Sequence, residues 1–377
     1  MDPYTLHIPS WYPSDTHELN GIFVRKHAEA VSSFRKVVVM YVTGSDRAYS
    51  TETVVNENMT EFTLYYKEST SRALNQIKYI RAQMDAFHYV LSRFGYPDLI
   101  HLHVVFPAGM FVWLLLLFRR IPLVVTEHWT GYTDEDGRYQ KLPAIARYIS
   151  ESLLHKARKI SVVSEYFKQV MISKGLVQRD KLVTVYNTLN VPATAYHYTE
   201  DKRLKALYVG NILELQKNIS ALIGAAEIIL RSYPDFQLTL VGGGNDLEHF
   251  KAVCRQKELL DRTIFFRGFV ANAGLVPIYE EHGFFVLTSH FETFNIAAAE
   301  AMMSGLPVVS TRCGGPSEFV NEKTGIWVDG DSAEAVAAAM LEMIRRRDEF
   351  DSSQIAAGAQ AKFSYATIQS QLRELYA

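Results

Sequence analysis

The sequence predicts an α/β protein built from two doubly wound, Rossmann-like domains, each with a parallel sheet. Short apolar, β-favouring runs alternate with helix-favouring stretches along the whole chain, a pattern typical of parallel sheets covered by helices. The alternation occurs twice, and its periodicity lapses around residues 190–200. A length of 377 residues, 48% of them hydrophobic, is enough for about two cores.

Each half of the chain contributes its own set of predicted strands. Those of the first half are residues 37–42, 99–102, 123–126, 160–163 and 182–185, and those of the second half are 205–209, 236–241, 263–266, 283–287 and 307–310. We therefore expect one domain over residues 1–192 and a second over 193–361. The tail, residues 362–377, is predicted to be a helix that can pack back on either domain. Ligands of such sheets bind at the carboxyl ends of the strands, so a cleft between the domains is expected.

Composition and charge exclude several classes of protein. The chain has only two cysteines, Cys254 and Cys313, too few for a disulfide framework, and its N-terminus lacks the pattern of a signal peptide, so we expect a cytoplasmic protein. The net charge of −2 does not favour nucleic-acid binding. Residues 1–192 carry 22 Lys and Arg against 18 Asp and Glu, a balance of +4 that suits an anionic lipid surface or acceptor.

The longest apolar run, residues 110–118, is well short of the roughly 18 residues of a transmembrane helix. We expect it to form a buried helix. Arg119 and Arg120 at its end leave a second interpretation open, in which this helix docks the N-terminal domain on the inner face of a membrane.

Glu292 and Glu300 are the most informative pair of residues. An apolar strand at 283–287 precedes them, and the segment 297–303 favours a helix that Gly305 and Pro307 end. If helix covered the whole interval, their α-carbons would lie about 12 Å apart, whereas a retaining glycosidase needs its carboxyl groups within roughly 5–5.5 Å. We infer that the two carboxylates hold different parts of one elongated ligand, with a phosphate at the helix start and a ribose at Glu300. A capped helix with a solvated Glu300 is the alternative.

Two further loops follow predicted strands of the second half. Gly243 lies in a glycine run, 242–244, that opens between a strand and a helix and offers a phosphate or ribose approach, although the run lacks the third glycine of a dinucleotide fingerprint. Gly210 and Asn211 begin another loop, in which Lys217 precedes a helix start. A lysine there is unfavourable beside the helix dipole unless an anion offsets it, and a solvated lysine is the alternative.

Several histidines and acidic residues of the first half are candidates for polar or metal-binding roles. His128 follows a buried strand and faces the expected cleft, where it can donate to a sugar hydroxyl. His101 and His103 share one face of a strand, but no third ligand stands at a recognisable spacing, so we predict no metal site. The segment from Asp134 to Asp136 matches a D-x-D pattern of metal-dependent sugar transfer, yet three acidic residues in a loop are usually solvated.

Together these segments resemble glycosyltransferase family 4, the retaining nucleotide-sugar-dependent transferases with the GT-B fold. The specific core is the E-x7-E element from Glu292 to Glu300, followed by a Gly-Gly-Pro-Ser-Glu segment at 314–318. Supporting pieces are the segments 97–109, 126–129, 162–165 and 185–188. The resemblance implies a nucleoside-diphosphate-sugar donor as co-substrate, a glycan or lipid-linked acceptor, and neither a metal nor a cofactor.

The resemblance also implies roles for single residues. Glu300 would bind the ribose, Glu292 and His128 would contact the donor sugar, and Lys217 would neutralise the diphosphate. The remaining donor-binding positions are the backbone amides of Phe294, Asn295 and Ile296, the approach of Gly21 to the phosphates, and Val270 beside the base, together with Gly210, Asn211 and Gly243.

Two departures from the family pattern concern the same site. Asn211 stands where the family has an arginine that pairs with Lys217 on the diphosphate, and a neutral donor makes a contact about half as strong. Thr293 and Asn295 replace two frequent glycines. Candidates for the missing positive charge are Arg25, Lys26 and Arg312. We predict a retaining, metal-independent sugar transferase of surface polysaccharide or glycolipid synthesis; the alternatives are a GT-B phosphorylase, a nucleotide-sugar epimerase and a non-catalytic nucleotide-sugar-binding protein.

Overall fold

A computed structural model describes residues 2–18, 20–189, 191, 198–271 and 274–377. The chain divides into two compact units, the first made of Met1–Thr188 with Tyr365–Ala377 and the second of Leu189–Ser364. The first unit thus ends four residues before the predicted boundary at 192 and includes the end of the chain. The predicted tail helix starts later than residue 362, because a helix of the second unit continues to Phe363.

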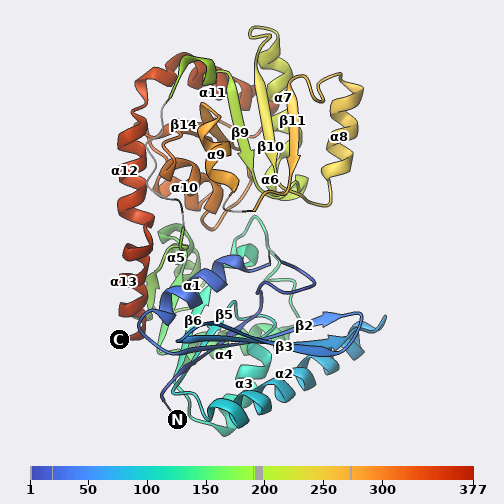
Figure 1. Ribbon diagram of the computed structural model, residues 1–377, viewed down its shortest axis with the longest axis vertical. Coiled ribbons are helices and arrows are strands. Elements are labelled where there is room, and N and C mark those ends of the chain that lie inside the picture. The colour runs from blue at the N-terminus through green and yellow to red at the C-terminus, as the bar shows by residue number, and fades with distance from the viewer. Residues whose placement is uncertain (1, 19, 190, 192–197, 272–273) are drawn as a thin grey trace. The chain divides into compact units, whose positions relative to one another are not determined.

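The first unit contains an eight-stranded sheet in the order β3-β4-β2-β1-β5-β6-β7-β8 (Figure 1). All neighbouring strands are parallel except β3 and β4, which form an antiparallel hairpin. The strands are β1 (Thr5–Pro9), β2 (Val37–Ser45), β3 (Tyr49–Asn56), β4 (Met59–Lys67), β5 (Leu99–His103), β6 (Leu123–Glu127), β7 (Lys159–Val162) and β8 (Leu182–Thr184). The sequence pattern does not indicate β1, β3 or β4. Most of β3 is exposed, so no buried apolar run marks it.

Helices cover both faces of this sheet. They are α1 (Ile22–Ser32), α2 (Arg72–Phe94), α3 (Gly109–Phe118), α4 (Ala144–Lys156), α5 (Glu165–Ser173) and α13 (Tyr365–Tyr376). Helix α13 packs against α1 and β7, and the four residues of its apolar face are buried: Ile368, Leu372, Leu375 and Tyr376. The last helix of the chain therefore completes the core of the first unit.

Helix α3 is the predicted apolar run. Only its first turn is buried, at Gly109, Phe111 and Val112, whereas Leu117 is exposed and Phe118 is 81% exposed. The prediction of a buried helix is therefore wrong for the last turn, because a run that is apolar on every side of a helix does not specify which side meets the core. Among the described residues, no helix combines the length and apolar character needed to span a membrane.

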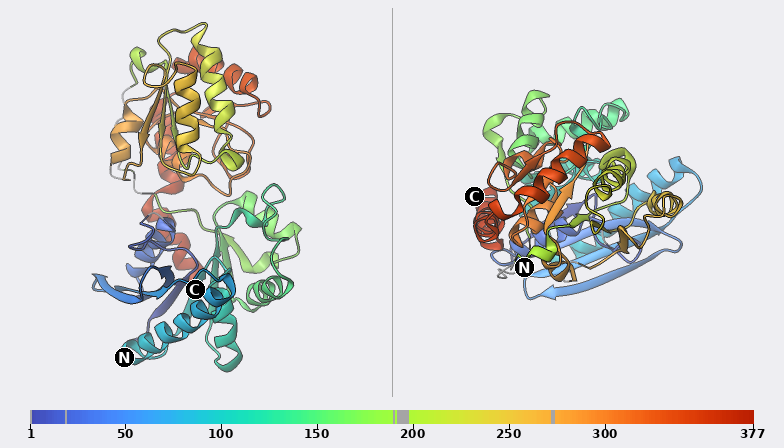
Figure 2. Two further views of the ribbon diagram at one scale, coloured as in Figure 1. Left: turned by 90° about the vertical axis from the view of Figure 1, so that its right-hand side faces the viewer. Right: turned by 90° about the horizontal axis from the view of Figure 1, so that it is seen from above.

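The second unit contains a six-stranded, fully parallel sheet in the order β11-β10-β9-β12-β13-β14. Its strands are β9 (Lys205–Val209), β10 (Gln237–Val241), β11 (Ile264–Gly268), β12 (Phe284–Leu287), β13 (Val308–Ser310) and β14 (Gly325–Trp327). Its helices are α6 (Glu214–Lys217), α7 (Ile219–Leu230), α8 (Leu247–Gln256), α9 (Leu275–Glu280), α10 (Ile296–Met303), α11 (Ala333–Arg346) and α12 (Ser352–Phe363). Helix α7 packs against α8 and α11, and α10 packs against α12 (Figure 2). The predicted fold class, two Rossmann-like parallel-sheet domains, is confirmed.

Candidate active site

A cluster of polar side chains in the second unit surrounds Glu292, in the loop between β12 and α10. Its Oε1 accepts hydrogen bonds from Lys217 Nζ at 2.5 Å, Ser289 Oγ at 2.8 Å and Asn295 Nδ2 at 3.0 Å. The side chains of Lys217 and Glu292 are only 12% and 8% exposed. The sequence assigned these two residues to the same donor but did not predict that they pair with each other. Ser289 was also missed, since a serine before a loop carries no distinctive signal.

Backbone contacts hold this loop in place. Glu292 N donates to Cys313 O at 2.6 Å, and Gly315 N donates to Glu292 O at 3.0 Å, so the loop pairs with the segment that follows β13. On the other side, His290 N donates to Gln216 O, and Thr288 Oγ1 donates to Lys217 O. Short helix α6 and the β12–α10 loop are therefore fixed to each other, which positions Lys217 beside Glu292.

Asn295 is the N-cap residue that precedes helix α10, and its backbone lies in the left-handed region with a φ of 73°. Asparagine tolerates this conformation better than most residues other than glycine. Its Oδ1 accepts from Ala298 N at 2.8 Å and caps the helix, while its Nδ2 donates to Glu292. The replacement of a frequent glycine therefore keeps the loop's backbone and adds one hydrogen bond to the carboxylate. Ile296 is the first residue of α10, and the Phe294 side chain packs in the core against Phe319 and Phe363.

Glu300 lies inside α10 and is only 6% exposed, so the interpretation of a solvated carboxylate is wrong. Tyr279 Oη, from α9, donates to Glu300 Oε2 at 3.4 Å. Burial, followed by the nearby Glu300 carboxylate, raises the pKa of Tyr279 well above its usual range, so its hydroxyl stays a donor. No sequence signal connected Tyr279 with Glu300, because the two residues come from different helices.

The glycine loops of the second unit meet at the ends of β9 and β10. Gly210 N donates to Val241 O, and Ile212 N donates to Gly243 O at 2.7 Å. A Cβ on Gly242 would lie 2.0 Å from Gly210 O, and one on Gly244 would lie 2.2 Å from Ile212 O, whereas a Cβ on Gly243 would meet nothing within 4 Å. Packing therefore requires glycine at 242 and 244 and leaves Gly243, the residue singled out from sequence, open on its Cβ side. Asn211 is exposed, and its carbonyl accepts from Tyr208 Oη at 2.8 Å.

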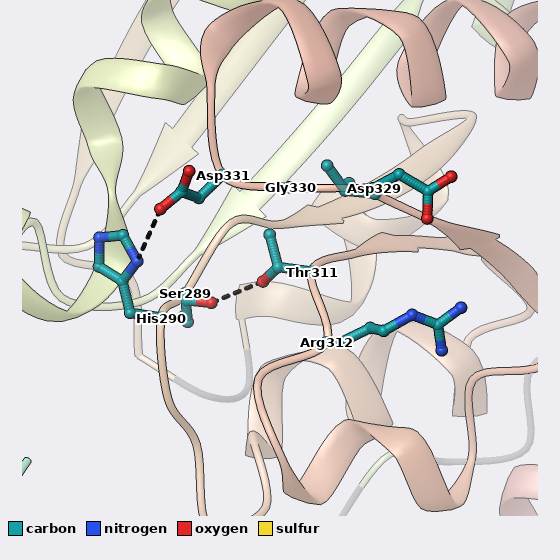
Figure 3. A pocket seen from close by; sticks show the side chains of 8 residues that line it. Ser289, His290, Thr311, Arg312, Asp329, Gly330 and Asp331 are labelled. Carbon is teal, nitrogen blue, oxygen red and sulfur yellow. Dashed lines mark hydrogen bonds and ion pairs between the residues drawn. The ribbon is translucent and has the colours of Figure 1, made fainter. Parts of the chain in front are cut away.

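A pocket of about 370 Å³ lies beside the Glu292 loop, at the carboxyl ends of β12, β13 and β14 (Figure 3). Its wall includes Ser289, whose carbonyl accepts from Thr311 Oγ1 at 2.6 Å, and His290, whose Nδ1 lies 3.9 Å from Asp331 Oδ2. Arg312 also lines it and lies over the Trp327 ring at 4.9 Å. Among Arg25, Lys26 and Arg312, the candidates for the missing positive charge, Arg312 thus belongs to the same unit as Glu292.

The remaining site candidates belong to the first unit or to the edge of the second. Gly21 precedes α1 with a φ of 70°, and a Cβ there would lie 2.3 Å from Trp11 O. His128 is buried directly after β6, with its ring 4.6 Å from that of Phe23. Arg25 is engaged with Glu61 at 2.8 Å. Val270 follows β11 and is half-buried.

The acidic loop at residues 134–136 is engaged within the first unit. Asp136 binds Arg138 and Thr130, and Asp134 pairs with Lys174, so both carboxylates have partners.

Comparison with known proteins identifies the class. The family described as Glycosyltransferase Family 4 matches residues 27–191, and the family described as Glycosyl transferases group 1 matches residues 203–346. The chain belongs to the GT-B glycosyltransferases that these two families describe.

Individual relatives agree with this placement. The chain is 28% identical over 305 residues to D-inositol 3-phosphate glycosyltransferase of Corynebacterium urealyticum, a match that covers 74% of this chain and 71% of the relative. It is 26% identical over 232 residues to an uncharacterized glycosyltransferase of Methanocaldococcus jannaschii, covering 58% of this chain and 59% of the relative. The chain thus spans less than two thirds of the length of that archaeal relative.

Solved structures share the fold. Sucrose-phosphate synthase from Thermosynechococcus elongatus superimposes with a TM-score of 0.81 at 20% identity, over 99% of this chain and 98% of that one. An Anabaena protein solved in complex with UDP and glucose gives a TM-score of 0.71 at 16% identity, over 98% of both chains. At these identities the likeness concerns the fold.

Proposed function

We propose that the protein is a retaining, metal-independent glycosyltransferase that moves a hexose-type sugar from a nucleoside diphosphate to an acceptor hydroxyl. The single observation that carries this proposal is the buried pair of Lys217 and Glu292 beside the start of α10. A cation, a carboxylate and a helix N-terminus at the carboxyl edge of a parallel sheet form a suitable environment for a diphosphate and its sugar.

The chemistry follows from the charges of this cluster. As the sugar–phosphate bond breaks, negative charge develops on the leaving diphosphate, and Lys217 would exchange its contact with Glu292 for that phosphate. The α10 N-terminus, at Asn295 and Ile296, adds the positive end of the helix dipole. Glu292 would then be released toward the sugar, where positive charge develops on the anomeric carbon. The acceptor hydroxyl would bond to the anomeric carbon as the phosphate leaves, and its proton would pass to the leaving phosphate oxygen. Such a mechanism depends on positioning and electrostatics and requires neither a protein nucleophile nor a metal.

Glu300 would hold the ribose hydroxyls from inside α10. Its burial and its contact with Tyr279 fix the carboxylate in one place, as a hydrogen-bond acceptor for two adjacent hydroxyls requires. The Anabaena protein of the same fold was solved with UDP-glucose, which supports a nucleoside-diphosphate sugar as the donor. The relative named D-inositol 3-phosphate glycosyltransferase and the structural neighbour described as a lipopolysaccharide galactosyltransferase support a role in surface glycan or glycolipid synthesis.

A pocket of about 510 Å³ in the first unit supports acceptor binding there. It opens near the carboxyl ends of β1, β2 and β4 and beside the loop after β5, where the strand order of the sheet reverses between β1 and β5. Ligands of doubly wound sheets bind at such switch points. Tyrosine rings offer apolar faces to a sugar, and charged or amide groups can bond its hydroxyls; these residues are Tyr41, Tyr66, Tyr79, Glu68, Arg72 and Asn75.

The first unit would also contact an anionic membrane surface. Large apolar side chains are exposed on three helices that lie next to one another, α2, α3 and α4. They include Ile77, Phe118 and Ile145, and exposed Arg119 and Arg120 directly follow Phe118 in the chain. Exposed apolar side chains together with arginines favour the interface of a bilayer with acidic headgroups. A lipid-linked acceptor would be reached from that surface.

Turnover assays test the proposal. Purified protein would be incubated with UDP-, GDP- and ADP-sugars, an extract of lipid and glycan acceptors, and EDTA, and the anomeric configuration of the product would be determined by NMR. We expect Lys217→Ala to reduce the rate severely and Glu300→Ala to weaken nucleotide binding, whereas Lys251→Ala, which breaks an exposed ion pair on α8, should leave both unchanged.

The same assay separates the other candidates. Product formed only with inorganic phosphate would identify a phosphorylase, and a changed sugar without an acceptor would identify an epimerase. Donors that stabilise the fold without being consumed would indicate a binding protein. Unaltered transfer kinetics in both Lys217→Ala and Glu300→Ala would overturn the assignment.

A further inference from the structure

Five histidines of the first unit gather on one face of its sheet. His7 lies on β1, His101 and His103 on β5, His128 directly after β6, and His27 on α1. All five are buried. The parallel register places His7 opposite His101, and the ring centroids of His101 and His103 are 3.9 Å apart, those of His27 and His128 5.6 Å. Strand register and one helix thus build a cluster that no local spacing in the sequence reveals.

One half of this cluster is a hydrogen-bonded chain. His103 Nε2 lies 3.1 Å from His7 Nδ1, and His7 Nε2 lies 3.0 Å from Tyr376 Oη. Tyr376 Oη lies 2.5 Å from His101 Nδ1, and His101 Nε2 lies 2.7 Å from Thr126 Oγ1. Both ring nitrogens of His7 and of His101 are therefore already engaged. These contacts would have to break before His7 or His101 could serve as a ligand.

The other half contains nitrogens without such contacts. His27 Nε2 lies 3.0 Å from Tyr186 O, and because a carbonyl only accepts, Nε2 carries the proton and Nδ1 carries the lone pair. Within the described part of the chain, Nδ1 of His27 and Nδ1 of His103 are buried and have no hydrogen-bond partner. Buried polar atoms without partners are rare in proteins, and a bound ion can satisfy them.

We propose that His27, His103 and His128 bind a Zn²⁺ ion, with a water molecule as the fourth ligand. One ring nitrogen from each residue lies within 4.8 Å of the other two. Zn–N bonds of about 2.0–2.1 Å in a tetrahedral site place the nitrogens roughly 3.4 Å apart. The rings therefore need to approach one another by no more than about 1.4 Å, a shift that side-chain rotation can supply.

The surroundings of two of the three rings, those of His27 and His103, suit metal binding. Metal-bound histidines usually donate their second N–H to a fixed acceptor, and His27 has Tyr186 O in that place while His103 has His7. If His103 Nε2 donates to His7, then His7 donates to Tyr376, Tyr376 to His101 and His101 to Thr126, so every hydrogen bond of this chain has one proton. Nδ1 of His103 then keeps its lone pair. The same residues that close the core of the first unit would thus orient two zinc ligands.

Zinc at this position would inhibit the enzyme. The resemblance to glycosyltransferase family 4 gives His128 a contact with the donor sugar of the proposed reaction, and a zinc ion would hold its ring in the histidine cluster instead. This consequence rests on the proposed function, whereas zinc binding itself depends only on the three histidines. Sugar transfer would proceed in EDTA and would slow when Zn²⁺ is added.

Metal binding is tested on the full chain, prepared with EDTA and then dialysed against Zn²⁺ or Co²⁺. We expect about one equivalent of zinc by elemental analysis, the visible absorption of tetrahedral Co²⁺, and a higher unfolding temperature with Zn²⁺. His27→Gln and His103→Gln should each abolish all three signals. His88→Gln, at an exposed histidine of α2, should retain them. Circular dichroism would establish that each variant is folded.

Several results would overturn the proposal. These are the absence of stoichiometric binding to the wild-type protein, binding that persists in both His27→Gln and His103→Gln, and binding that is lost only in His88→Gln. Transfer assays in EDTA keep the two proposals apart, since a metal-free protein without turnover would contradict the proposed function and leave zinc binding intact. Bound zinc that does not slow transfer would refute the inhibition.

Discussion

The pair of Lys217 and Glu292 gives the sharpest stability prediction. Removing one partner of a buried ion pair costs about 3–5 kcal/mol, because the other charge is left without its counter-ion. In Lys217→Met, Glu292 Oε1 keeps its hydrogen bonds from Ser289 and Asn295, so we expect a smaller loss of about 2–3 kcal/mol. In Glu292→Gln, the lysine can turn its ammonium toward water, and the loss should be about 1–2 kcal/mol.

The interaction itself is measured by a double-mutant cycle. The double variant carries neither charge, so its loss should be about 1.5 kcal/mol smaller than the sum of the two single losses. Because the chain has two units, native-state hydrogen exchange of α10 peptides would report the free energy of opening for the second unit alone. The exposed pair of Lys251 and Glu248, changed in the same way, is the matched control and should show a coupling of no more than about 0.5 kcal/mol. Additive losses at Lys217 and Glu292 would show that the pair contributes nothing to the loop.

Three further predictions concern the second unit. Asn295→Ala should destabilise this unit by about 2 kcal/mol, because alanine is strained in the left-handed conformation and cannot cap the helix. Asn295→Gly should lose less than half of that free energy. Equal losses of unfolding free energy in urea would show that the backbone conformation contributes nothing. Arg347 is fully buried and donates to Gly283 O, Phe350 O and Ser352 Oγ. Arg347→Met should therefore cost about 2–4 kcal/mol of unfolding free energy in the same assay, and Arg347→Lys should not restore the wild-type stability. Burial lowers the pKa of His282, so the unfolded chain takes up this proton before the folded chain as the pH is lowered. The free energy of unfolding should therefore decrease by up to about 1.4 kcal/mol per pH unit below pH 6.5. An identical pH profile of the unfolding free energy in His282→Gln would contradict this.

Particular elements show how far sequence reasoning reached. Buried strands such as β6 and β12 were predictable, because both faces of a central parallel strand are covered and its sequence is a continuous apolar run. Strand β3 was not, since it is an edge strand that is mostly exposed. The α3 run was identified as a helix, but its uniform apolarity gave no sign that Phe118 would be exposed.

The candidate site divides in the same way. The spacing of Glu292 and Glu300 and the strand-to-helix change between them were sufficient to place one carboxylate in a loop and the other in a helix. The contact of Glu292 with Lys217 joins residues 75 positions apart, and the contact of Glu300 with Tyr279 joins two helices. Side-chain contacts of that range depend on how the elements pack, which periodicity does not encode.

By itself, the sequence determined the fold class, the positions of the central strands and the residue types available for a donor site, because these depend on burial patterns and loop chemistry that are local along the chain. Only the tertiary structure decided which of those residues meet. His101 and His103 had no third partner by spacing, yet strand register added His7, and α1 and the end of β6 added His27 and His128. Tyr376, one residue before the end of the chain, reaches the same cluster because α13 packs on the first unit. Packing brings together residues that are distant in sequence, and the polar groups buried with them must then find partners.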